Sequence, residues 1–288
     1  MPPLRSVLFV PGDQPQMQAK ARTLPADAIV LDLEDAVAPA HKAAARLQVH
    51  RALEEGFPER LAVFVRPNAA ASGLLREDLE AVLHPRASGL MLPKVAGPEE
   101  VREVDAWLGA LEPQRGIAVG ALRLLVIVET PRAVLEAFAI ARASPRVVGL
   151  AFGADDLAAA MGLARTVAPA DLRYPRAQVA LAAHAAGVEA VDVVYTTVED
   201  LGGFRREAEE ARALGYTGKQ VIHPRQIELA NLIFSPSPQE VAWARRVIEA
   251  YEAAPRGAIM VEGRMVDAPV VRQAWRILER AREGEARG

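Results

Sequence analysis

The sequence contains no cysteine. Disulfide bonds, thiolate nucleophiles and zinc sites built from thiolates are therefore excluded. It also lacks an apolar run near the roughly 18 to 20 residues that a membrane helix needs, and Met1–Arg5 lacks the apolar core of a signal peptide. The net charge of −3 argues against a nucleic-acid footprint. We therefore expect a cytoplasmic protein that binds neither membranes nor nucleic acid.

A glycine-rich phosphate loop, typical of open doubly wound sheets, is also missing after the first strand-like run. The sequence instead alternates helical patterns with eight short apolar runs that show no polar alternation. The runs are Ser6–Val10, Ala28–Leu31, Ala62–Val65, Gly89–Leu92, Leu124–Val128, Val147–Ala151, Ala190–Val194 and Lys219–Ile222. Such runs indicate parallel strands buried on both faces, and eight βα units predict an α/β fold of the TIM (β/α)8 barrel type.

The chain continues well past the eighth run. Ser237 and Glu240 are spaced as a capping box, with Pro238 at the first helical position. The expected order is a helix from 238 to about 251, an extended β-turn-β segment over 259–267 and a last helix from 269 to about 282. We predict a catalytic barrel over residues 1–235 and a C-terminal helical extension over 236–288, whose apolar face contacts a neighbouring subunit.

Carboxylates follow several of the apolar runs, which is where a TIM barrel carries its chemistry. Glu129 ends the fifth run, and an ionised glutamate there is costly unless it is paired or coordinates a metal. Asp155 and Asp156 follow the sixth run. Mg²⁺ binds one or two protein carboxylates, and Glu129 and Asp156 are our candidates. Two alternatives remain open: an ion pair of Glu129 with Arg66 or Lys94, and Asp155 as a helix N-cap.

Basic side chains share this rim. Arg66 precedes a proline, which holds its backbone extended, and its planar fork suits a substrate carboxylate. Its other possible role is to neutralise the acids of residues 32–35. Lys94 could be a Schiff-base lysine, which needs a depressed pKa, but the nearby acids favour a charged lysine. His223 is either a general base or a structural residue. The rim is completed by Asp32, Glu34, Asp35, Asn68 and Asp192.

Seven segments resemble one known family, in order along the chain. They are Arg5–Gly12, Leu31–Val37, Val65–Asn68, Leu92–Lys94, Val128–Pro131, Phe152–Leu157 and Ile222–Pro224. They resemble the citrate lyase beta subunit and its CitE-like relatives in the HpcH/HpaI aldolase superfamily, which includes malyl-CoA and citramalyl-CoA lyases. The resemblance implies a Mg²⁺-dependent TIM barrel, as a homotrimer or hexamer. It also implies a lyase that cleaves or forms a carbon–carbon bond between an acetyl-CoA-like thioester and a 2-oxo acid such as oxaloacetate.

The resemblance also implies roles for single residues. Glu129 and Asp156 match the metal carboxylates, and Arg66 matches the arginine that binds the oxo-acid carboxylate. The residues expected around the substrate are Arg66, Glu129, Gly153, Ala154, Lys94 and Asp32. Residues 262–269 resemble the tail of the free-standing lyases, in which an aspartate reaches a neighbouring subunit's site. Asp267 is therefore expected to be the acid/base group that protonates the thioester enolate.

Two other functions compete with this interpretation. A CoA-independent class II aldolase of the pyruvate type usually relies on a histidine near the first strands, and no histidine precedes His41. A citrate lyase complex subunit would instead act beside an acyl-carrier protein, with the extension serving assembly. The sequence leaves open which oxo acid and which acyl carrier are used.

Overall fold

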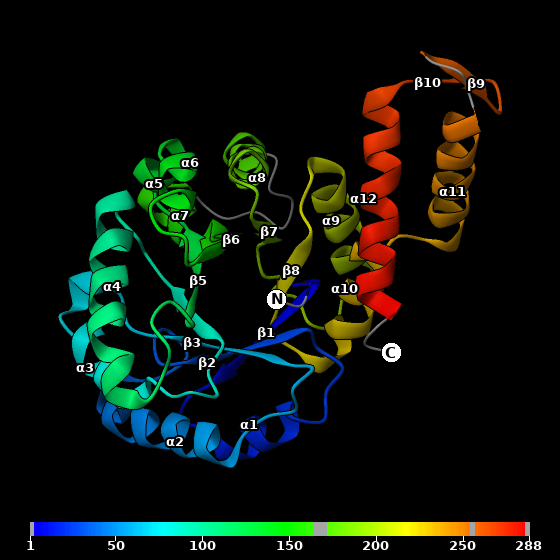
Figure 1. Ribbon diagram of the computed structural model, residues 1–288. Coiled ribbons are helices and arrows are strands. Elements are labelled where there is room, and N and C mark those ends of the chain that lie inside the picture. The colour runs from blue at the N-terminus through cyan, green and yellow to red at the C-terminus, as the bar shows by residue number, and fades with distance from the viewer. Residues whose placement is uncertain (1–2, 164–171, 254–256, 286–288) are drawn as a thin grey trace.

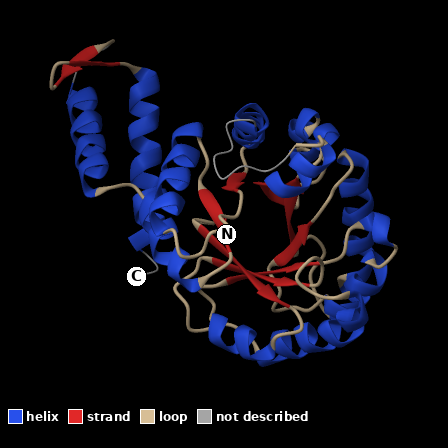
Figure 2. Ribbon diagram, turned by 180° about the vertical axis from the view of Figure 1, so that it is seen from behind, coloured by secondary structure: helices blue, strands red, loops and turns tan. Residues whose placement is uncertain are grey.

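The computed structural model describes residues 3–163, 172–253 and 257–285. Eight parallel strands form a closed barrel in chain order, with β1 paired to both β2 and β8 (Figures 1 and 2). The strands are β1 Ser6–Pro11, β2 Ala28–Asp32, β3 Ala62–Arg66, β4 Gly89–Leu92, β5 Arg123–Val128, β6 Val147–Phe152, β7 Glu189–Asp192 and β8 Gly218–Val221. The predicted TIM barrel is thus confirmed, with every strand within two residues of its expected ends.

Helices surround the barrel on its outer side (Figure 2). They are α1 Pro15–Ala21, α2 Lys42–Glu55, α3 Leu75–Val82, α4 Pro98–Leu111, α5 Pro131–Leu135, α6 Ala137–Ala141, α7 Ala154–Ala160, α8 Arg173–Ala186, α9 Leu201–Leu214 and α10 Ile227–Phe234. Short 3₁₀ turns occupy Pro39–His41, Ala70–Ser72, Pro113–Arg115 and Pro224–Gln226. In the part of the chain that the structure describes, no helix has the length and apolarity needed to cross a lipid bilayer.

The strands are buried on both faces, which explains why most of them have an unbroken apolar sequence. The exception is β8, which carries buried Lys219 and Gln220. Side chains such as Val30, Phe64 and Leu125 fill the interior of the barrel. Alternate residues such as Leu31 and Val126 pack against the surrounding helices. Both layers are needed in a parallel barrel, so polar residues are displaced to the strand ends.

The C-terminal extension, here called the arm, contains α11 Pro238–Ala253, β9 Ile259–Val261, β10 Arg264–Val266 and α12 Ala268–Glu285. The predicted capping box is formed: the Ser237 hydroxyl accepts from the Glu240 N–H at 3.2 Å, and Glu240 accepts from the Ser237 N–H at 2.7 Å. The two helices share a small core of their own that is separate from the barrel core. The arm projects from the barrel with the β9–β10 hairpin at its far tip (Figure 1).

Candidate functional site

Charged side chains gather at the carboxyl ends of β2 to β6. Asp32 ends β2 and is in register with Arg66, which ends β3. Lys94 follows β4, while Glu129 and Gly153 follow the paired strands β5 and β6. We call the group formed by Asp32, Glu34, Asp35, Arg66, Lys94, Glu129 and Asp156 the strand-end cluster. The barrel topology therefore brings together residues that lie far apart in the sequence.

Arg66 is held on three sides. Its Nε and Nη2 donate to the two carboxylate oxygens of Asp32 at 2.7 and 2.6 Å. Its guanidinium lies over the ring of Phe9, 4.9 Å from the ring centroid. Its Nη1 lies 3.1 Å from Oε2 of Glu34. Of the three guanidinium nitrogens, Nη1 is therefore the one that points away from Asp32 and towards Glu34.

The carboxylate of Asp32 is fully buried and saturated. Besides the two bonds from Arg66, it accepts the backbone N–H of Glu34 at 2.9 Å and that of Ala36 at 3.1 Å. A substrate has no access to these oxygens, so the expectation that Asp32 touches substrate is corrected. Asp32 positions Arg66 and the loop after β2.

Glu129 is a buried carboxylate with one oxygen restrained. Its Oε1 accepts the backbone N–H of Lys94 at 2.5 Å. A Cβ at Gly153 would lie 2.5 Å from Oε2, so only glycine fits beside this carboxylate. Burial raises the pKa of Glu129 to about 8, and the charges of Asp156 and Glu34 add to the shift. A cation placed here would reverse that shift.

Lys94 lies among the carboxylates. Its Nζ is 3.0 Å from Oε1 of Glu34, 3.1 Å from Asp35 and 3.8 Å from Asp156. Burial acts to lower the pKa of Lys94, but the hydrogen bonds to Glu34 and Asp35 outweigh it and raise the pKa. These ion pairs favour the charged form of the lysine, which is the opposite of what a Schiff-base lysine needs.

Helix α7 carries both aspartates in its first turn. The N-cap of this helix is Gly153, so the suggestion that Asp155 is the N-cap is wrong. The helix starts two residues earlier than an N-cap at Asp155 would place it. Asp156 keeps 42% of its side chain exposed, whereas Ala154 is fully buried. Asp156 is thus the acid of this pair that lies within reach of Lys94.

The cluster has the donors that Mg²⁺ requires. Glu129 and Asp156 offer hard oxygens. Oε2 of Glu34 is also buried, and among the described residues it has an ion-pair contact of 3.1 Å with Arg66 but no hydrogen bond. Within the described residues no three acidic or imidazole groups converge as a complete metal cage. That is compatible with Mg²⁺, which usually keeps waters and takes one or two carboxylates plus substrate oxygens. The residues present fit this ion.

Two predicted rim residues are engaged elsewhere. Asp192 is fully buried and accepts from Arg176 at 2.7 and 2.8 Å and from Nζ of Lys219 at 2.5 Å. Nδ1 of His223 accepts the backbone N–H of Arg225 at 3.2 Å and caps the turn that follows β8. This bond gives His223 a structural contact, and its role as a general base stays a prediction. The partners of Asp192 were missed because they come from other elements, with no local spacing to reveal them.

Asp267 lies in the arm, directly after the hairpin at its tip. Its Oδ1 accepts the backbone N–H of Val270 at 3.3 Å and so caps α12. The arm carries this hairpin away from the barrel of its own chain (Figures 1 and 2). Within one chain, the structure does not bring Asp267 to the strand-end cluster.

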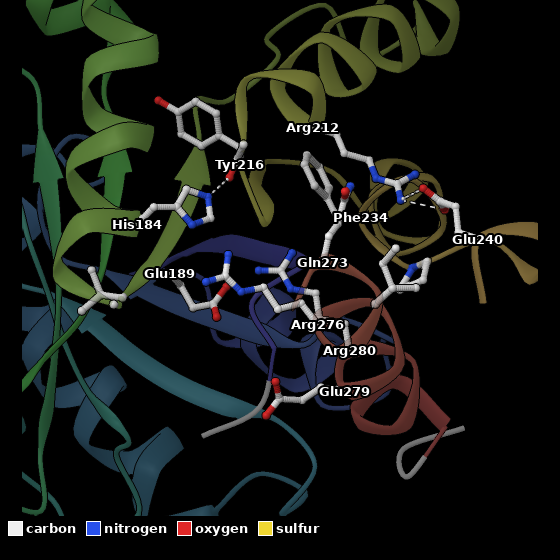
Figure 3. Close-up of a pocket in the computed structure, with 15 residues that line it drawn as sticks. His184, Glu189, Arg212, Tyr216, Phe234, Glu240, Gln273, Arg276, Glu279 and Arg280 are labelled. Atoms are coloured by element: carbon white, nitrogen blue, oxygen red, sulfur yellow. Dashed lines mark hydrogen bonds and ion pairs between the residues drawn. The ribbon is translucent and has the colours of Figure 1, made fainter. Parts of the chain in front are cut away.

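A groove of about 800 Å³ lies between α12 and the barrel (Figure 3). It touches Glu189, which begins β7, so it lies at the opposite strand end from the cluster. Its charges are mixed: Arg276 and Arg280 lie near Glu189 in Figure 3, and Arg212 pairs with Glu240 at 2.8 Å. This groove lacks the paired acids of the cluster and is not the predicted site.

The comparisons with known proteins agree with this geometry. A family model described as HpcH/HpaI aldolase/citrate lyase matches residues 5–224. The chain is 38% identical over 280 residues to citrate lyase subunit beta of Escherichia coli strain K12, with 96% of this chain and 93% of that protein covered. It is 37% identical over 289 residues to the mitochondrial citramalyl-CoA lyase of Homo sapiens, with 94% and 84% covered.

A solved structure extends the similarity to three dimensions. CitE from Mycobacterium tuberculosis, crystallised with magnesium, acetoacetate and coenzyme A, superposes with a TM-score of 0.78. The two chains share 36% identity, and the match covers 97% of this chain and 98% of that one. The segments that suggested the resemblance are therefore part of a match that extends over nearly the whole chain. The chain belongs to the HpcH/HpaI aldolase/citrate lyase family.

Proposed function

We propose that this protein is a Mg²⁺-dependent carbon–carbon lyase. Its substrate is a 3-hydroxy-acyl thioester of the citryl-CoA, malyl-CoA or citramalyl-CoA type, which it cleaves to acetyl-CoA and a 2-oxo acid such as oxaloacetate, or forms in reverse. The observation that carries the proposal is the excess of acid around buried Glu129, next to an arginine whose Nη1 faces the same space. Relatives named as citrate and citramalyl-CoA lyases, and a relative that binds magnesium, acetoacetate and coenzyme A, support it.

Glu129 and Asp156 would hold the metal. When bound, Mg²⁺ supplies a Lewis acid and a template for the oxygens of the oxo acid. Gly153 leaves room for the Glu129 carboxylate, and Ala154 contributes backbone to the same wall. In this role Glu129 stays ionised, because a cation lowers the pKa that burial raises.

Arg66 would bind the carboxylate of the oxo acid. Since Asp32 occupies Nε and Nη2, the substrate contact falls to the end of the fork that carries Nη1. The stacked Phe9 ring and the Asp32 pair fix the plane of the guanidinium before substrate arrives. Such preorganisation favours one orientation of the bound acid.

Asp267 would act in the site of a neighbouring copy, within a homotrimer or hexamer. In cleavage, the hydroxyl proton passes to water, and the carbon–carbon bond breaks to give the 2-oxo acid and the thioester enolate. Asp267 then donates a proton to the α-carbon of the enolate and regains one from water. Exposed apolar side chains on the tip of the arm and on the outer helices of the barrel support an interface between the arm of one copy and the barrel of the next. Met260 and Met265 lie at the tip of the arm, and Leu135, Phe138 and Leu181 lie on the barrel helices α5, α6 and α8.

The direct test is an assay of the isolated chain with citryl-CoA, malyl-CoA and citramalyl-CoA, with Mg²⁺ and with excess chelator. We expect release of a 2-oxo acid from at least one thioester and no release with chelator. Activity only on an acyl-carrier-protein thioester would point to a complex subunit, and cleavage without any thioester would point to an aldolase. For Asp267, mixing inactive Glu129→Ala and Asp267→Ala chains should restore activity, and failure after proven subunit exchange would refute the shared site.

A further inference from the structure

Lys94 has an unusual backbone. Its φ is +51°, and Glu262 in the arm hairpin is the other described non-glycine residue with a positive φ. A lysine in this left-handed region is uncommon and persists where its surroundings require it. The consequence is visible in its contacts, because this one residue touches both acidic pairs of the strand-end cluster.

The side chain of Lys94 serves the first pair. Its ammonium lies between Glu34 and Asp35, at 3.0 and 3.1 Å, and is farther from Asp156, at 3.8 Å. Arg66 adds a weaker contact of 3.7 Å to Asp35. Without the ammonium, two neighbouring carboxylates would share only one end of an arginine that Asp32 already binds. Such a pair would attract a divalent cation.

The backbone of Lys94 serves the second pair. Its N–H donates to Oε1 of Glu129, which leaves Oε2 as the oxygen over Gly153, at the start of the helix that carries Asp156. The left-handed conformation is what aims the N–H at Glu129 while the side chain reaches the opposite pair. Lys94 thus restrains the Glu129 carboxylate with its backbone and neutralises the Glu34–Asp35 pair, which would otherwise compete for the metal, with its side chain.

We infer that Lys94 determines which carboxylates bind the metal, by filling the Glu34–Asp35 pair with its ammonium and orienting Glu129 with its backbone N–H. It is a positioning residue, and this role requires no contact with substrate. The inference rests on the metal site of the proposed function. It is nonetheless tested without substrate, so that a chain inactive as a lyase could still confirm it.

The test uses Mn²⁺ as the probe and counts bound ions by electron paramagnetic resonance. The double variant Glu129→Gln/Asp156→Asn should bind Mn²⁺ at least about 100-fold more weakly than the wild type. Adding Lys94→Met should restore one bound Mn²⁺ per chain at Glu34 and Asp35. Adding Lys94→Arg, which keeps the charge, should not. A triple variant with methionine that binds no more Mn²⁺ than the double variant, or an arginine variant that also gains an ion, overturns the inference.

Two further variants separate the backbone from the side chain and guard against misfolding. Lys94→Gly and Lys94→Val both lack the ammonium, but glycine accepts a positive φ and valine resists it. Valine should therefore weaken Mn²⁺ binding at Glu129 about tenfold relative to glycine, and equal affinities would refute the backbone role. If the triple variant does not fold, the single Lys94→Met variant decides: two Mn²⁺ per chain support the inference, and one contradicts it.

Discussion

Two charged groups in this barrel differ in whether the protein itself balances them. In the first, here called the closed network, Arg176 and Lys219 face Asp192 and Glu207, and all four are buried. In the strand-end cluster, the ion pairs made by the described residues give the five carboxylates two cations, Arg66 and Lys94. The pKa shifts are opposite: burial alone would raise the pKa of Asp192, but Lys219 and Arg176 lower it, whereas burial raises the pKa of Glu129 to about 8.

The balance of charge within each group separates buried charges that stabilise the fold from buried charges that serve a function. The closed network satisfies its acids through the pairing of Asp192 with Lys219 on adjacent strands and through an arginine from α8. Among the described residues, the strand-end cluster has more carboxylates than cations, and Glu129 lies beside the partly exposed Asp156. A buried carboxylate without a matching cation from the chain is explained if a metal ion from solution binds it and balances its charge.

The largest expected effect comes from opening the closed network. Lys219→Met leaves Glu207 without its cation and Asp192 with one fewer, so the free energy of unfolding should fall by about 3–5 kcal/mol. The matched change in the other group, Glu129→Gln, removes an acid whose ionisation opposes folding, so it should not lower the free energy of unfolding of the metal-free protein. Urea unfolding of both variants measures the contrast. Equal losses would contradict the distinction between the two groups.

A smaller effect is expected from Gly153→Ala. The new Cβ would lie 2.5 Å from both Cβ and Oε2 of Glu129, so the carboxylate must move, at about 1–3 kcal/mol of strain. Lyase activity and Mg²⁺ affinity should fall with it. Gly109→Ala on α4 is the control, because its Cβ would meet only the end of Arg146, at 3.9 Å. If both variants retain full Mg²⁺ affinity, Gly153 has no role in holding Glu129.

A third contrast is a pH dependence of opposite sign in the two groups, measured after removal of metal. The pKa of Glu129 is about 8 in the folded chain and about 4.3 when unfolded, so the folded state binds more protons and stability should fall as pH rises between these values. The pKa of Asp192 is lowered, so its contribution is complete above about pH 4 and is lost as pH falls through the folded pKa. Glu129→Gln should flatten the first slope only; an unchanged slope would contradict the assignment to Glu129.

Sequence patterns predicted the barrel because most of its strands have an unbroken apolar run, and the capping box at Ser237 because its spacing is local. They also located the acids at the strand ends. Sequence patterns could not predict contacts between residues of different helices and strands. No local spacing links Asp192 to Arg176, or Arg66 to Phe9. The left-handed backbone of Lys94 was also missed, since lysine carries no signal for it.

The most direct measurement of the central claim is a calorimetric titration of Mg²⁺ into the wild type and into Glu129→Gln. Lys219→Met, if it stays folded, serves as the control from the closed network. We predict one Mg²⁺ per chain in the wild type and the control, and binding weakened at least about 100-fold in Glu129→Gln, because the ion loses a direct carboxylate ligand. Equal Mg²⁺ affinity of the wild type and Glu129→Gln would contradict the claim that the strand-end cluster is completed by a metal ion.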